Sequence, residues 1–86
     1  MCKYTEEEIL DEFKKIGYVN VIKEDQTITL HNPTKSRTIY INEDNSFSVV
    51  IGPPHLVGFL RLMIIDFPTI KEKHLIKKLI KLRKEK

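Results

Sequence analysis

Histidine and cysteine side chains are the groups in this 86-residue sequence that could bind a metal ion. A protein zinc site needs ligands at short spacings, such as Cys-x-x-Cys or two histidines four residues apart. Cys2, His31, His55 and His74 show no such spacing. The pattern therefore predicts no metal site, and local packing explains the histidines better. A single cysteine also means that no disulfide forms within the chain.

Motifs for nucleophilic catalysis and for phosphate binding are missing from the sequence. The glycines lie far apart, so they make no phosphate-binding loop, and there is no Gly-x-Ser-x-Gly. His31 can lie near Tyr40 or Ser46 on a sheet face, but such a cluster would be shallow and wet. Loop 32–37 has donors for an anion, although a solvated hairpin turn accounts for it better. We therefore predict a protein that is not an enzyme, with no catalytic residue, no cofactor and no small-molecule substrate.

Positive charge is concentrated at the end of the chain. Residues 67–86 hold eight Lys or Arg against two Glu, whereas residues 1–66 hold seven against ten, which together give the net charge of +3. A lysine-rich helix face is typical of a solvated surface or of a surface that binds phosphates. A membrane surface is disfavoured because the apolar side of this helix lacks Trp and Phe. The candidate nucleic-acid contacts are Lys71, Lys73, Lys77, Lys78, Lys81 and Lys84.

Apolar residues are in surplus between residues 55 and 66. Pro54 favours a helix start there, and the helix that the pattern predicts is apolar nearly all round. Such a helix needs cover on most sides, so its excess surface either is ordinary exposed apolar area or forms an interface with a protein partner or a second copy. The candidate interface residues are Phe59, Leu62, Met63 and Ile65.

Two further helices are marked by their start signals. Thr5 with Glu8, and Thr69 with Glu72, have the Thr-x-x-Glu spacing of a capping box. Apolar residues at helical spacing follow each box, so we expect helices over residues 6–16 and 70–84. Gly17 supplies the left-handed residue that ends the first helix.

Between these helices the hydrophobic period changes to two, which predicts strands. They cover residues 18–23, 27–31, 37–41 and 46–51, separated by short polar turns. Alternation places the apolar residues on one face and the hydroxyl-bearing residues, with Tyr18 and His31, on the other. The apolar face carries Val19, Val21, Ile28, Leu30, Ile39, Ile41, Phe47, Val49 and Ile51.

The elements together predict a fold of the α+β class. We expect one domain over residues 1–86, a two-layer structure with the order α-β-β-β-β-α-α, in which helices cover one face of a four-stranded antiparallel meander. The helix–sheet–helix order is similar to that of double-stranded RNA-binding domains, but the Lys-Lys-x-Ala-Lys helix start of that family is absent, so no family is identified.

The function that these features favour is binding rather than catalysis. We expect a small cytoplasmic regulatory protein that acts through protein–protein contacts, and the Ile- and Lys-rich composition suits a phage or mobile element of a low-GC bacterium. The alternative is a nucleic-acid accessory protein that uses the basic face of the last helix. No apolar stretch reaches the length of a membrane span.

Overall fold

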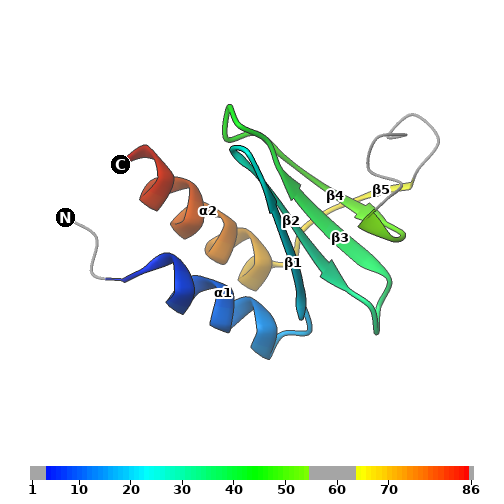
Figure 1. Ribbon diagram of the computed structural model, residues 1–86. Helices are drawn as coiled ribbons and strands as arrows, with labels where there is room; N and C mark the ends of the chain where they lie inside the picture. Colours follow the sequence, from blue (N-terminus) through cyan, green and yellow to red (C-terminus); the bar gives the residue numbers. More distant parts are fainter. Residues whose placement is uncertain (1–3, 55–63, 86) are drawn as a thin grey trace. The chain divides into compact units, whose positions relative to one another are not determined.

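A computed structural model describes residues 4–54 and 64–85 of the chain (Figure 1). It is an α+β structure with one antiparallel sheet of five strands and two helices in the described part. The chain divides into two compact units, of which residues 17–67 contain the sheet and the flanking segments contain both helices. The elements in order are α1 (Glu6–Lys15), β1 (Asn20–Glu24), β2 (Thr27–Asn32), β3 (Arg37–Ile41), β4 (Phe47–Ile51), β5 (Ile64–Asp66) and α2 (Ile70–Lys84).

Both helices begin at the capping boxes that the sequence predicts. The amide of Glu8 donates to Oγ1 of Thr5 at 3.2 Å, and the amide of Thr5 donates to Oε1 of Glu8 at 3.4 Å. Thr69 and Glu72 repeat this exchange at 3.2 Å and 2.9 Å. Each box satisfies amides that the first helical turn leaves without a partner. The predicted bounds of 6–16 and 70–84 are therefore confirmed to within one residue.

The two helices lie side by side in one compact unit (Figure 1). The helix α1 buries Ile9 and Phe13, which are spaced one turn apart. The helix α2 buries Leu75, Ile76 and Leu79, which belong to its predicted apolar stripe. Spacings of three and four residues place these side chains on a single face of each helix.

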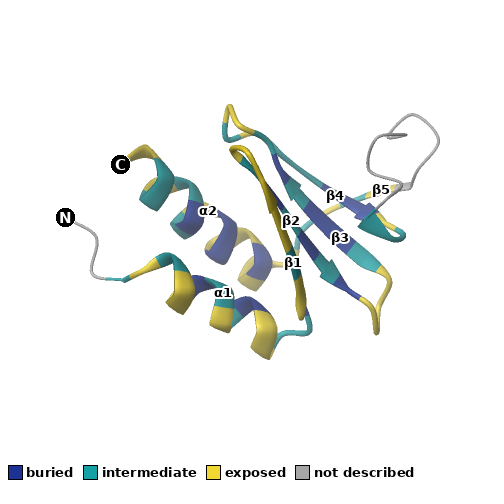
Figure 2. Cartoon of the chain, in the orientation of Figure 1, coloured by how far each residue is buried: buried dark blue, intermediate teal, exposed yellow. Residues whose placement is uncertain are grey.

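The sheet is a meander in which each strand pairs with the next along the chain. The register pairs Leu30 with Ile39 and Ile39 with Val49, so these side chains form a row on one face. The residues of this face that are buried are Ile28, Leu30, Ile39, Ile41 and Val49 (Figure 2). Alternation therefore predicted the central apolar face correctly.

The predicted helix over residues 55–66 is wrong where the structure describes it. Ile64–Asp66 form the strand β5, paired with β4 through Val50↔Ile65 and Ile51↔Ile64. A short apolar run does not distinguish a helix from a buried strand by its period, and β-branched neighbours favour the strand. Residues 55–63 of the predicted helix lie outside the described residues, as do three of the candidate interface residues, Phe59, Leu62 and Met63.

The predicted division of the sheet residues into an apolar and an open polar face needs correction at five residues. Tyr18, expected on the open face, is fully buried, and so are Thr38 and Val50. Val19 and Ile51, expected on the covered face, are exposed. Tyr18 and Val19 precede β1, so strand alternation does not govern them. The hydroxyl of Thr38 is satisfied at its buried position because it donates to the carbonyl of Gly52 at 2.7 Å.

Candidate functional site

Four of the six candidate lysines form one exposed face of α2. Lys73, Lys77, Lys81 and Lys84 fall within about 80° of arc when each residue advances about 100° around the helix. All four are exposed. The centre of this arc lies about 150° around the helix from the buried residues Leu75, Ile76 and Leu79. We call Lys73, Lys77, Lys81 and Lys84 the lysine face; Ile70 lies within its arc, and His74 lies about 20° beyond it.

The other two candidate lysines point elsewhere. Lys78 is half-buried, and its ammonium group lies 5.6 Å from the centre of the Tyr4 ring, within the range of a cation–π interaction. Lys71 is exposed but lies about 120° around the helix from the centre of the lysine face. The sequence alone did not separate these two lysines from the other four.

A hollow lies beside Lys78 between α1 and α2. Its volume is about 120 Å³, and it is lined by Tyr4, Glu8, Ile9, Glu12, Leu75 and Lys78. Pockets that enclose small-molecule ligands usually measure about 300–1,000 Å³. The hollow is therefore too small to enclose a substrate of ordinary size.

The candidate interface residue Ile65 lies on the edge strand β5 and is 63% exposed. Phe67, which sequence reasoning did not single out, follows this strand and is 87% exposed. In the sequence, Phe67 lies between Asp66 and Pro68, outside any periodic apolar pattern. This position is the only sequence signal that its side chain is not part of the core. We call Ile65 and Phe67 the apolar pair.

An ion pair fixes the backbone of Phe67. The guanidinium of Arg37 pairs with the carboxylate of Asp66, and its Nη2 donates to the carbonyl of Phe67 at 3.2 Å. The amide of Phe67 donates to Oδ1 of Asp66 at 2.8 Å. Nε of Arg37 donates to the phenol oxygen of the buried Tyr18 at 3.3 Å. Both polar backbone groups of Phe67 are therefore bonded, so its backbone is held at the end of β5 while its side chain is exposed.

Loop 32–37, considered above as an anion site, uses its polar groups internally. Oδ1 of Asn32 accepts the amide of Lys35 at 3.1 Å, and the carbonyl of Ser36 accepts the amide of Gly52 at 2.7 Å. The guanidinium of Arg37 is turned toward Asp66. These bonds are those of a closed hairpin turn, which was the favoured interpretation of the sequence.

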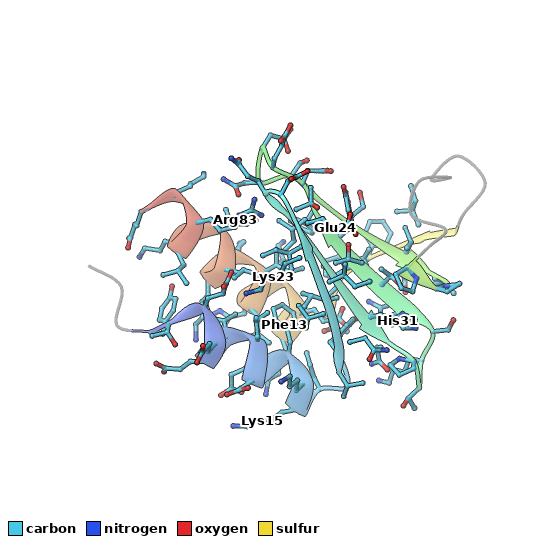
Figure 3. The ribbon with its side chains drawn as sticks, in the orientation of Figure 1. Phe13, Lys15, Lys23, Glu24, His31 and Arg83 are labelled. Atoms are coloured by element: carbon cyan, nitrogen blue, oxygen red, sulfur yellow. The ribbon has the colours of Figure 1, made fainter. Side chains whose placement is uncertain are left out.

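His31 hydrogen-bonds to Thr38 and to the backbone of Arg37, and not to Tyr40 or Ser46, the two neighbours that the sequence allowed. Its Nδ1 lies 3.0 Å from Oγ1 of Thr38 and 3.2 Å from the carbonyl of Arg37. Figure 3 labels His31 on the sheet. Ser46 instead bonds Asp44 in the turn before β4, where its hydroxyl donates to Oδ1 at 2.6 Å. Within residues 4–54 and 64–85, no three His, Cys, Asp or Glu side chains come together as metal ligands.

The hydrogen bonds of Thr38 assign the tautomer of His31. The hydroxyl proton of Thr38 is given to Gly52, so Oγ1 of Thr38 accepts from the histidine. The carbonyl of Arg37 also only accepts. Both partners therefore require the proton on Nδ1, which leaves Nε2 as the acceptor nitrogen when the ring is neutral.

Comparison with known proteins gives no further assignment. No protein-family model matches the chain, and no curated protein or solved structure is significantly similar to it. In the described residues, none of the helices has the length and the apolar character needed to cross a membrane.

Proposed function

We propose that this chain is a small non-enzymatic binding protein that acts through protein–protein contacts at the apolar pair. The observation that carries the proposal is Phe67, whose side chain is 87% exposed while its backbone is held by Arg37 and Asp66. Aromatic side chains are enriched among the residues that dominate protein interfaces. An anchor whose backbone is already held loses less conformational freedom on binding than one on an unbonded segment.

The energy available from the apolar pair is substantial for so small a surface. Burying a Phe or Ile side chain contributes about 1.5–3 kcal/mol each. Ile65 lies two residues before Phe67, so one partner surface can reach both. The strand β5 has only three residues, so few backbone groups are free for strand addition, and the side chains must supply most of the contact.

The two-layer arrangement predicted from the sequence, with helices over the apolar sheet face, stays a prediction and is part of this proposal. Its support is the burial of Ile28, Leu30 and Ile39 on one sheet face and of Leu75 and Ile76 on α2. The apolar pair is exposed, which leaves it available to a partner.

Site-specific photo-crosslinking tests the proposal. A photoreactive phenylalanine analogue is placed at position 67 and, as the matched control, at Val19, which is 53% exposed and lies next to β1 at the opposite edge of the sheet. We expect position 67 to crosslink to one discrete protein or to a second copy, and Val19 not to. Sedimentation of the purified chain distinguishes self-association from a separate partner. A monomer that crosslinks equally weakly from both positions would overturn the proposal.

A further inference from the structure

We infer that the lysine face of α2 binds the phosphate backbone of nucleic acid without reading its base sequence. This site is separate from the apolar pair, and the inference goes beyond the proposed protein contacts. It depends on the placement of Lys73, Lys77, Lys81 and Lys84 and on what surrounds them.

Within residues 4–54 and 64–85, the lysine face lacks acidic partners like those of Lys14 and Lys15 in α1. In α1, Lys14 lies 3.9 Å from Asp11 and Lys15 lies 3.5 Å from Glu12, each three residues away. In the described part of the chain, the lysine face makes no ion pair. Glu72, an acid of the same helix, is buried and bonded within the capping box. Lys14 and Lys15 of α1 are therefore close to carboxylates of their own helix, whereas the lysines of the lysine face are not.

The positive charges of neighbouring lysines on the lysine face also repel one another. Lys73 and Lys77, and Lys77 and Lys81, are four residues apart, and like charges at this spacing destabilise a helix by about 0.2–0.5 kcal/mol per pair. Lys81 and Lys84 gain from the negative end of the helix dipole, because they lie in or near its last turn. Lys73 and Lys77 lie too far from that end to gain in the same way. A ligand of opposite charge would offset the repulsion that these two lysines introduce.

The geometry of the lysine face suits a linear polyanion. With a rise of about 1.5 Å per residue, Lys73, Lys77 and Lys81 are spaced about 6 Å apart along the axis, and the face extends over about 16 Å to Lys84. A nucleic-acid strand carries charges at a fixed repeat, which an acidic protein surface does not. Lysine meets a phosphate as a point charge, and the lysine face has no Arg, Asn or Gln to read base edges.

A membrane surface fits the lysine face less well. A helix that lies in the lipid interface buries an apolar side, but Leu75, Ile76 and Leu79 of α2 are already buried in the protein. Ile70 is exposed beside the lysines, and one such side chain contributes little insertion. The charge of the lysine face therefore points to phosphates in solution.

Salt-dependent binding of the full chain to labelled duplex DNA and RNA of random sequence tests the inference. Four phosphate contacts on B-DNA give a slope of about −3.6 for log affinity against log salt, which is a loss of about 100-fold between 50 and 200 mM. Replacing Lys73 and Lys77 by Gln should halve that slope. The matched control replaces Lys71 and Lys35, which are also exposed and change the net charge equally. We expect the control to leave the slope and the affinity within about twofold of the parent.

Three outcomes would overturn the inference. Equal weakening by K73Q/K77Q and by K71Q/K35Q would show attraction by net charge alone. If polyglutamate bound the lysine face more tightly than the duplexes, the partner would be an acidic protein. If vesicles containing phosphatidylserine bound this face more tightly than the duplexes, the partner would be a membrane surface. Circular dichroism verifies that each variant keeps its helices. Replacing Ile65 and Phe67 by Ser should leave duplex binding unchanged, which separates a failure here from a failure of the proposed protein contacts.

Discussion

Arg37 and Asp66 form an ion pair that reaches across β4, from the start of β3 to the end of β5. The two residues are 29 positions apart in the sequence, and together they hold the backbone of Phe67. Arg37 is largely buried and Asp66 is partly exposed. The pair therefore links the edge strand to the middle of the sheet and also positions the side chain that we assign to partner binding.

Removal of the Asp66 charge should weaken the sheet and loosen Phe67. We expect Asp66→Asn to lower the free energy of unfolding by about 1–3 kcal/mol, since it leaves the Arg37 guanidinium without its carboxylate. A double-mutant cycle with Arg37→Gln, followed by chemical denaturation, measures the coupling. Glu43→Gln, at an exposed turn, is the control for loss of a carboxylate. A coupling near zero would mean that the pair does not hold β5 in place.

Gly17 should not tolerate a side chain. Its φ is +105°, and a Cβ there would lie 2.5 Å from Nδ2 of the buried Asn32. We expect Gly17→Ala to destabilise the fold by more than the roughly 1 kcal/mol that a positive φ alone costs an L-residue. Gly52→Ala is the matched control because Gly52 also has a positive φ, of 140°. Equal losses of unfolding free energy in the two variants would refute the steric explanation.

The carboxylate of Asp44, in the turn before β4, should take up a proton only at acidic pH. The side-chain hydroxyl of Ser46, and then its amide, hold the pKa of Asp44 below the ordinary value of 3.8. A lowered pKa in the folded state stabilises the fold above pH 3.8, and this stability is lost as the pH falls through the lowered value. Ser46→Ala should move the pKa of Asp44 back toward 3.8 in an NMR titration. Ser48→Ala, which removes a hydroxyl from β4 itself, should leave the titration of Asp44 unchanged.

Thr38 should be needed for the orientation of His31. We expect Thr38→Val to cost about 1–3 kcal/mol, because the partly buried Gly52 carbonyl loses its donor and Nδ1 of His31 loses an acceptor. Thr29→Val, on the same face of the sheet but only half-buried, should cost less. Nitrogen-15 NMR of the neutral ring should show the proton on Nδ1 in the parent chain. A proton on Nε2 would contradict the hydrogen-bond assignment.

Local signals in the sequence predicted most of the secondary structure. The boxes at Thr5 and Thr69 defined the helix starts because capping involves residues only three apart. Strand alternation predicted the buried row of Leu30, Ile39 and Val49 because adjacent strands are joined by short turns, which fix the register. These features depend on near neighbours, and near neighbours are visible in a sequence.

Features that depend on distant partners were not predicted. The strand β5 exists through its pairing with β4 and through Asp66, whose partner Arg37 no local pattern identifies. Tyr18 was placed on the wrong face because it precedes β1, and its phenol oxygen accepts from the same distant arginine. The lysine face was anticipated as a basic helix, but the diversion of Lys78 toward Tyr4 requires knowledge of the neighbouring helix.

The pairing of α1 with α2 has a consequence for the folding pathway. Since α1 ends at Lys15 and α2 begins at Ile70, 54 residues separate two helices that share one compact unit. Closing an unstructured chain of that length costs about 3.5 kcal/mol of entropy beyond a constant. The hairpins of the meander close over only a few residues, so they can form earlier and shorten the remaining loop. We therefore expect nucleation in the central hairpins, and substitutions at Leu79 to accelerate unfolding far more than they slow refolding.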